Sequence, residues 1–298
     1  MPLILILILS LNIIYPTANE NFNNNLDKQF PKKFVNDSLG ISTTAKSVLV
    51  VDKESNKILF AKNKNEVLPI ASITKLMSVL ILLDCEIDWR QEVVIKKEDR
   101  REGGRIYLGY GEVVTAKDLL NLALIASDNQ AIIALARISN LSNEDFVKSM
   151  NVKAKELKMG KTEFFDPAGL NPKNVSTAED LIKLSVEIFN HDNIVEILSK
   201  DKYFFRNINI GRFHQVFSTN RLLNSFLADK GSEYFLNAGK TGHLEEAGYC
   251  FFCEAKNNNG NKIFVVILGS ETNQSRFQEA KALISWVFTN WEWEKSDA

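Results

Sequence analysis

Three short motifs contain two serines and two lysines that could together carry out acyl transfer. The motifs are Ser72-Ile-Thr-Lys75, Ser127-Asp-Asn129 and Lys240-Thr-Gly242. A serine hydroxyl becomes a nucleophile when a nearby base takes its proton, and a lysine amine can be that base where burial keeps it neutral. Each motif alone is weak evidence, because Ser199-Lys-Asp-Lys202 repeats the first pattern and Ser218-Thr-Asn220 repeats the second. The residues around each match must therefore decide which matches could be catalytic.

The first motif opens a segment that becomes almost wholly apolar after Lys75. Residues three apart on a helix lie roughly 60° apart around its axis, so the Lys75 amine can reach the Ser72 hydroxyl. The start of a helix also offers backbone N–H groups to a developing oxyanion. The structural alternative is a serine that caps the helix, followed by a lysine that extends to solvent. Ser199 and Lys202 stand among charged and polar residues, as in a solvated segment.

The other two motifs also have a plain structural alternative. Ser127-Asp-Asn129 interrupts two helical patterns, at 116–126 and 130–137, which predicts short polar groups at a helix–helix junction. The alternative is a capping turn, since these residue types favour turns. Lys240-Thr-Gly242 precedes a predicted strand; in extended structure Lys240 and Gly242 share one face and Thr241 the other. Glycine lets a substrate backbone approach closely, whereas the alternative is an edge strand that carries a lysine for solubility.

Elements from both ends of the chain must position these motifs. Residues 47–62 predict two strands around a turn at 53–56, and 248–256 with 262–269 predict another pair around a turn at 257–261. Isolated hairpins are marginal, so we expect both pairs in one antiparallel sheet, flanked by helices, in an α/β (α+β) fold. Helical patterns at 76–83, 116–137, 143–158 and 177–190 predict an inserted, mostly helical lobe, and a final helix at about 275–290 would cover the sheet.

The order of the three motifs is that of penicillin-binding proteins and β-lactamases. From about Lys46 to Trp286 the chain resembles the low-molecular-mass penicillin-binding proteins, the serine-type D-alanyl-D-alanine carboxypeptidases and endopeptidases. The segments that carry the resemblance are Pro69-Ile-Ala-Ser-Ile-Thr-Lys-Leu-Met77, Phe165-Asp-Pro-Ala-Gly-Leu170, Ser176-Thr-Ala-Glu-Asp180, Thr219-Asn-Arg-Leu-Leu223 and Lys240-Thr-Gly-His-Leu-Glu-Glu-Ala-Gly-Tyr249. The resemblance implies a β-lactamase-like transpeptidase fold with an antiparallel sheet of the five-stranded type, a peptidase domain at 46–298 and a helical lobe at about 86–230.

The resemblance also implies roles for the residues that match. Ser72 would attack the carbonyl between two terminal D-alanines, Lys75 would take its proton, and Ser127 would relay a proton to the leaving amine. Lys240 would hold the electrostatic field of that network, on the same substrate-binding strand as Gly242.

Further matching residues would bind the substrate. Asn129 would hydrogen-bond its peptide, and Thr241 would bind its terminal carboxylate, with Arg221 as a second candidate for that anion. The backbone N–H groups of Ser72 and His243 would form the oxyanion hole.

The implied substrates are peptidoglycan stem peptides, with carboxypeptidase activity favoured over endopeptidase activity, and β-lactams would act as covalent inhibitors. No metal or cofactor is implied. Two alternatives stay open: a class A-like β-lactamase, and a catalytically weak sensor that binds muropeptides or β-lactams. A β-lactamase needs a carboxylate to activate the deacylating water, for which Glu163 and Asp166 are the nearest candidates.

Composition argues against a nucleic-acid-binding protein and against a disulfide-stapled scaffold. The 36 Lys and Arg residues against 37 Asp and Glu residues give no net positive charge for binding nucleic acid. Three cysteines cannot staple a chain of 298 residues. Cys250 and Cys253 would point to opposite sides of one strand, too far apart to form a disulfide, and Cys85 is predicted to lie in the core.

The N-terminal segment predicts export. Residues 3–15 are almost entirely apolar, which is short for a transmembrane helix but typical of a signal peptide. We therefore expect residues 1–18 to be a signal peptide or an N-terminal membrane anchor and residues 19–45 to be a polar linker. The peptidase domain would then work outside the cytoplasm, in the periplasm or cell-wall space.

Overall fold

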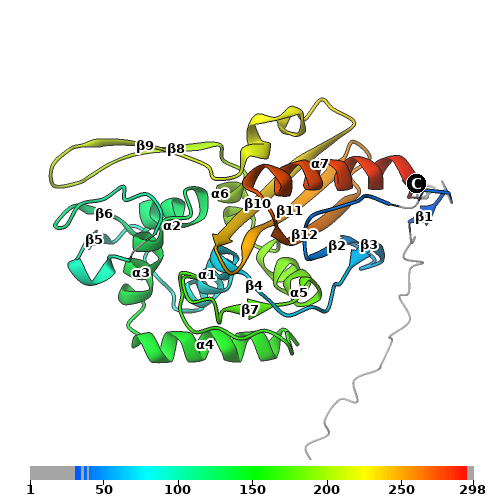
Figure 1. The fold of residues 1–298 in the computed structure, drawn as a ribbon. Coiled ribbons are helices and arrows are strands. Elements are labelled where there is room, and N and C mark those ends of the chain that lie inside the picture. The colour runs from blue at the N-terminus through cyan, green and yellow to red at the C-terminus, as the bar shows by residue number, and fades with distance from the viewer. Residues whose placement is uncertain (1–30, 35–36, 39, 102, 294–298) are drawn as a thin grey trace, which may run out of the picture.

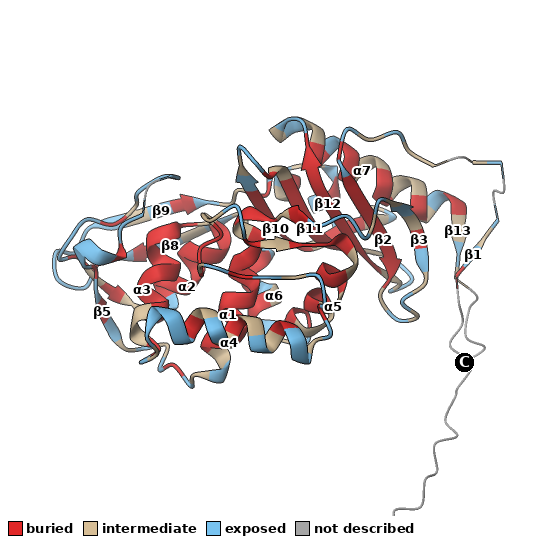
Figure 2. Cartoon of the chain, turned by 60° about the horizontal axis from the view of Figure 1, so that its bottom comes forward, coloured by how far each residue is buried: buried red, intermediate tan, exposed pale blue. Residues whose placement is uncertain are grey.

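The computed structural model describes residues 31–34, 37–38, 40–101 and 103–293, and the expected signal peptide or anchor at 1–18 lies outside them. The main sheet has five antiparallel strands in the order β10-β11-β12-β2-β3. Their bounds are Tyr234–Leu244, Gly248–Asn257, Lys262–Ser270, Ser47–Asp52 and Ile58–Lys62. The central strands are the most apolar and the most completely buried, as Figure 2 shows. The prediction that both chain ends build one antiparallel sheet is therefore confirmed.

Helices cover both faces of this sheet (Figure 1). Helix α7 (Asn273–Asn290) packs on β11 and β12, whereas α5 (Ala178–Ile188) packs on β12 and β2 from the other side. Alternate residues of β11 feed two separate cores, since Phe251 and Cys253 join the α7 side and Phe252 and Cys250 join the other. The two cysteines thus face opposite sides and stay free, as predicted.

Helix α1 (Thr74–Asp84) is almost fully buried and packs against α2 (Ala116–Ile125), α3 (Asn129–Ile138), α4 (Asn143–Glu156) and α5. The described residues also form α6 (Asp192–Leu198) and the 3-10 helices η1 (Ala71–Ile73), η2 (Lys97–Asp99), η3 (Arg221–Asn224) and η4 (Phe226–Ala228). Thr115 caps α2 together with Asp118, and Thr177 caps α5. Cys85 was predicted in the core but is only half-buried, because α1 ends beside it.

Four two-stranded sheets complete the part of the fold that the structure describes. They pair β1 (Lys32–Lys33) with β13 (Trp291–Glu292), β4 (Leu68–Pro69) with β7 (Val175–Ser176), β5 (Glu92–Val94) with β6 (Val113–Thr115), and β8 (Lys202–Arg206) with β9 (Phe213–Phe217). The pair β1–β13 ties part of the expected linker to the end of α7. Within the described residues, no helix has both the length and the apolar character that a membrane span needs.

Candidate active site

Ser72 lies in η1, and the helical turn runs directly on into α1, so the side chain of Lys75 rises beside it. The Lys75 Nζ atom lies 2.9 Å from the Ser72 hydroxyl oxygen. Lys75 is completely buried while Ser72 is half-buried, so the hydroxyl can meet solvent and the amine cannot. Burial lowers the pKa of Lys75 to about 7, although the carboxylates of Asp128 and Asp166 oppose this shift. A large fraction of Lys75 is therefore neutral at neutral pH and can accept a proton.

Two further acceptors fix the Lys75 amine in place. Its Nζ atom donates to the Asn129 side-chain oxygen at 2.7 Å and to the Ala168 carbonyl at 2.6 Å. The Asn129 amide in turn donates to the Gly103 carbonyl at 3.1 Å. The middle residue of the second motif, Asp128, caps α3 by accepting from the Ala131 N–H at 2.7 Å.

Ser127 stands in the break between α2 and α3, where the interrupted helical pattern placed it. Its backbone adopts the left-handed conformation, with a φ of 58°, which turns the side chain out of the helix direction. The Lys240 Nζ atom lies 2.6 Å from the Ser127 hydroxyl and 3.0 Å from the Thr241 carbonyl. Burial, together with the positive charges of Lys75 and Arg276, lowers the pKa of Lys240 well below its usual range. The second and third motifs thus meet although 113 residues separate Ser127 from Lys240.

Strand β10 passes very close to Ser72. A side chain on Gly242 would come within 2.7 Å of the Ile70 carbonyl oxygen and 3.2 Å of the Ser72 backbone nitrogen. Only glycine therefore lets this outer strand lie against η1. A second tight contact supports η1, since a side chain on Gly169 would overlap the Ala71 carbonyl oxygen at 2.1 Å. His243 follows at an exposed position, with its ring stacked on Tyr249 at 4.1 Å.

Thr241 faces away from Lys240 and Gly242, as the strand alternation predicts. In the register with β11 it stands opposite Phe251, and its hydroxyl lies 2.6 Å from the Thr219 hydroxyl. Arg221 is close in sequence to Thr219, yet its side chain is exposed on η3 and lines a cavity of about 400 Å³ with Lys281. The structure therefore groups Thr241 with Thr219 and leaves Arg221 at the margin.

Arg276 is a buried contributor that the sequence did not reveal. Its guanidinium, from α7, donates to the carbonyls of Gly242 at 2.8 Å and Cys250 at 3.0 Å. It thus holds the end of β10 from the α7 side, and burial lowers its pKa to about 10. The 34 residues between Gly242 and Arg276 left no local signal in the sequence.

Asp166 organises the loop that presents Ala168 to Lys75. One of its oxygens accepts from the backbone N–H groups of Ala168 and Gly169, both at 2.7 Å, and of Leu170 at 3.2 Å. The other accepts from the Asn171 N–H at 2.6 Å. This carboxylate, named above as a candidate for activating water, is thus engaged by four backbone amides.

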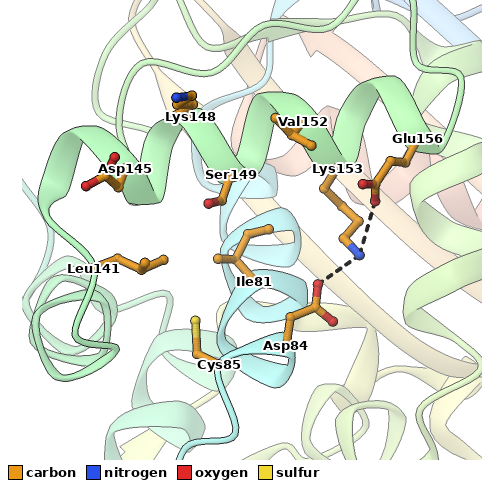
Figure 3. A pocket seen from close by; sticks show the side chains of 10 residues that line it. All are labelled: Ile81, Asp84, Cys85, Leu141, Asp145, Lys148, Ser149, Val152, Lys153 and Glu156. Carbon is orange, nitrogen blue, oxygen red and sulfur yellow. Dashed lines mark ion pairs between the residues drawn. The ribbon is translucent and has the colours of Figure 1, made fainter. Parts of the chain in front are cut away.

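A separate cavity of about 450 Å³ lies between the end of α1 and α4 (Figure 3). It contains Cys85, and at its rim Lys153 forms ion pairs with Asp84 at 2.8 Å and Glu156 at 3.4 Å. None of the motif residues lines it. Among the described residues, no group of His, Cys, Asp and Glu side chains could hold a metal ion. The motif residues instead meet at the junction of η1, the α2–α3 break and β10.

Comparisons with known proteins give one consistent result. Residues 33–272 match the sequence profile of a family described as D-alanyl-D-alanine carboxypeptidase. A D-alanyl-D-alanine carboxypeptidase of Bacillus subtilis is 32% identical over 254 residues, which cover 83% of this chain and 63% of that protein. A D-alanyl-D-alanine endopeptidase of Escherichia coli is 30% identical over 256 residues, which cover 82% of this chain and 77% of that protein.

Solved structures agree with these sequence matches. Penicillin-binding protein D2 of Listeria monocytogenes, in its cefotaxime-bound form, is 30% identical, with a TM-score of 0.72 over 84% of this chain and 100% of that one. The Streptomyces K15 DD-transpeptidase superposes with a TM-score of 0.77 over 85% of this chain and 100% of that one, at 22% identity, and so supports the fold alone.

Proposed function

Because the chain belongs to the D-alanyl-D-alanine carboxypeptidase family, we propose that it is a serine D,D-peptidase that cleaves D-alanyl peptide bonds of peptidoglycan stem peptides. One observation carries the proposal: the buried Lys75 amine, with its pKa near 7, lies 2.9 Å from the Ser72 hydroxyl. Carboxypeptidase action on the terminal D-alanine is the favoured reaction. Relatives of both kinds resemble the chain, so cleavage of crosslinks is the competing one.

The reaction begins with attack of the Ser72 oxygen on the carbonyl carbon of the D-alanyl bond, while Lys75 takes the hydroxyl proton. The carbonyl oxygen becomes an oxyanion, which the backbone N–H groups of Ser72 and His243 stabilise. The tetrahedral intermediate then collapses, the C–N bond breaks, and the leaving amine receives a proton through Ser127, which is hydrogen-bonded to Lys240. Water hydrolyses the ester of Ser72 and regenerates the hydroxyl.

Substrate binding falls to residues around this centre. Asn129 would offer its amide to the peptide, while Thr241 binds the terminal carboxylate and Arg221 attracts that anion from the margin. The same acylation chemistry applies to β-lactams, and a cefotaxime-bound form is known of the similar Listeria protein. We place the reaction outside the cytoplasm, because the substrate is there, with residues 1–18 as the export signal or anchor.

The proposal is tested by intact-protein mass spectrometry after mixing with benzylpenicillin, followed over time. A stable adduct is expected on the native chain, on the Ser199→Ala control and not on the Ser72→Ala variant. An adduct that survives Ser72→Ala would exclude Ser72 as the nucleophile. Penicillin consumed without a lasting adduct would support a β-lactamase, a reading disfavoured by the four backbone amides that engage Asp166.

Release of D-alanine from a D-Ala-D-Ala pentapeptide separates an enzyme from a sensor. We expect continuous turnover that depends on Ser72. If the peptide acylates the protein once and is not turned over, the protein is a sensor and not an enzyme.

A further inference from the structure

The hairpin formed by β8 and β9 presents an unusual outer face. Three phenylalanines on it are largely exposed: Phe204 at 45%, Phe213 at 61% and Phe217 at 56% of their surface. The rings of Phe204 and Phe213 stack across the two strands with their centres 5.8 Å apart. The turn between the strands adds two exposed aliphatic side chains, Ile208 at 46% and Ile210 at 55%. Several exposed apolar side chains gathered on one hairpin are a feature of interaction surfaces.

The inner face of the hairpin is fixed, so the exposed side chains cannot turn inward. The Tyr203 hydroxyl donates to Asp118 on α2 at 2.7 Å, and the His214 ring stacks on Phe205 at 4.7 Å. The turn is fixed as well, because the Ile208 N–H donates to the Val113 carbonyl at 2.7 Å. Since side chains alternate between the two faces, reversing the hairpin would expose this whole inner set.

The charge on the hairpin has one sign. Residues 202–217 contain Lys202, Arg206 and Arg212 and no aspartate or glutamate. On the outer face the cations alternate with the aromatic rings, since Arg206 stands opposite Phe213 and Lys202 opposite Phe217. Arg212 forms an ion pair with Glu112, a buried carboxylate that also accepts from Asn207 on the inner side of the hairpin. Apolar side chains flanked by cations are the composition of surfaces that bind anionic membranes.

We propose that the outer face of the β8–β9 hairpin docks on an anionic lipid bilayer. Ile208, Ile210 and the phenylalanine rings would enter the interface, while Lys202 and Arg206 meet the headgroups. A glycan strand is rich in hydroxyls and would instead bind a surface of amide and carboxylate side chains. Asn209 at the turn has its amide committed to Val113 and Gly111.

This surface has a suitable place on the molecule. The hairpin lies across the helical part on the side away from α4, as Figures 1 and 2 both show. The chain leaves β9 at Phe217 and reaches Thr219, whose hydroxyl contacts Thr241, two residues later. Docking of the hairpin would therefore also set the distance of the catalytic residues from the bilayer.

The test is an environment-sensitive fluorophore placed on the full chain at Ile210→Cys, in a Cys85→Ser background that leaves only the buried cysteines. Vesicles of phosphatidylglycerol and phosphatidylcholine are titrated in. We expect a blue shift of the emission, and no such shift from a label at Val152→Cys, an exposed aliphatic position on α4. Because the N-terminal segment is identical in both proteins, the difference between the labels reports the hairpin.

Charge is tested in the same labelled chain. Arg206→Gln should weaken the apparent vesicle affinity about fivefold, whereas Lys148→Gln on α4 should leave it unchanged. Equal shifts at both labels, no shift at position 210, or an equal response to vesicles of phosphatidylcholine alone would each overturn the proposal. So would a shift of the label at 210 with isolated peptidoglycan sacculi but not with vesicles, which would assign the face to the cell wall.

Discussion

Lys75 and Lys240 are both completely buried, yet the two sides of the site surround them with different charges. On the helix side, the carboxylates of Asp128 and Asp166 raise the pKa of Lys75 against the effect of burial and hold it at about 7. On the strand side, Lys240 has Lys75 and Arg276 as its charged neighbours, and both lower its pKa further. Equal burial therefore lowers the pKa of both amines, while the neighbouring charges act on them in opposite directions.

The difference suggests a direction for the proton. A proton taken from Ser72 by Lys75 meets two compensating carboxylates, whereas a proton on Lys240 meets two cations. Lys75 is therefore the better proton acceptor, whereas Lys240 orients the Ser127 hydroxyl that passes the proton on to the leaving amine. If replacing Lys75 and replacing Lys240 slowed acylation equally, the two lysines would not have these different roles.

The largest effect is expected from Lys75→Gln. Glutamine keeps a donor for the buried acceptors but cannot take a proton, so the rate of acylation by benzylpenicillin should fall about a thousandfold. Stopped-flow or quenched mass spectrometry measures this rate, and thermal unfolding checks that the fold survives. A loss of less than tenfold would remove Lys75 as the base.

Lys240→Gln is the matched variant on the strand side. Its amine lies 2.6 Å from Ser127 but does not contact Ser72, so the acylation rate should fall by about a hundredfold. The measurement is the same acylation assay, run beside the Lys75 variant. A loss larger than that of Lys75→Gln would reverse the assignment and make Lys240 the base.

Much of this arrangement could be predicted from the sequence, because its signals are local. The Ser72–Lys75 spacing, the polar break at Ser127 between two helical patterns, and the glycine at 242 each depend on a few neighbouring residues. Four of the five strands of the main sheet followed from two apolar hairpins that needed partners. Such patterns report which face of an element is buried.

The features that the sequence did not reveal depend on contacts between distant segments or on weak sequence patterns. The Arg276 bonds to β10 join residues far apart in the chain, and sequence reasoning could name Asp166 only as a possible base rather than as the support of a loop. The β8–β9 hairpin was missed for another reason. Its outer face carries phenylalanines as well as cations, so the alternation of apolar and polar residues that announces a strand is weak there.

The smallest effect is expected from Asp128→Asn, which tests directly whether a neighbouring carboxylate sets the pKa of Lys75. The Asp128 carboxylate raises the pKa of Lys75, so Asp128→Asn should lower that pKa and shift the acid limb of the acylation rate to lower pH. Asparagine keeps the side-chain oxygen that caps α3 at Ala131, so the fold should persist. Burial raises the pKa of Asp128 itself to about 6, so its charge acts on Lys75 mainly above that pH.

The acylation rate of the native chain should rise with pH through about 7, because the neutral amine of Lys75 is the active form. Between pH 6 and 7 the Asp128→Asn variant should be faster than the native chain, by less than about tenfold, and above pH 8 the two should converge. Asp145→Asn, an exposed carboxylate at the start of α4, is the matched control and should leave the profile unchanged. A limb that stays in place in Asp128→Asn would mean that burial alone sets the proton affinity of Lys75, and that the carboxylates do not distinguish the two lysines.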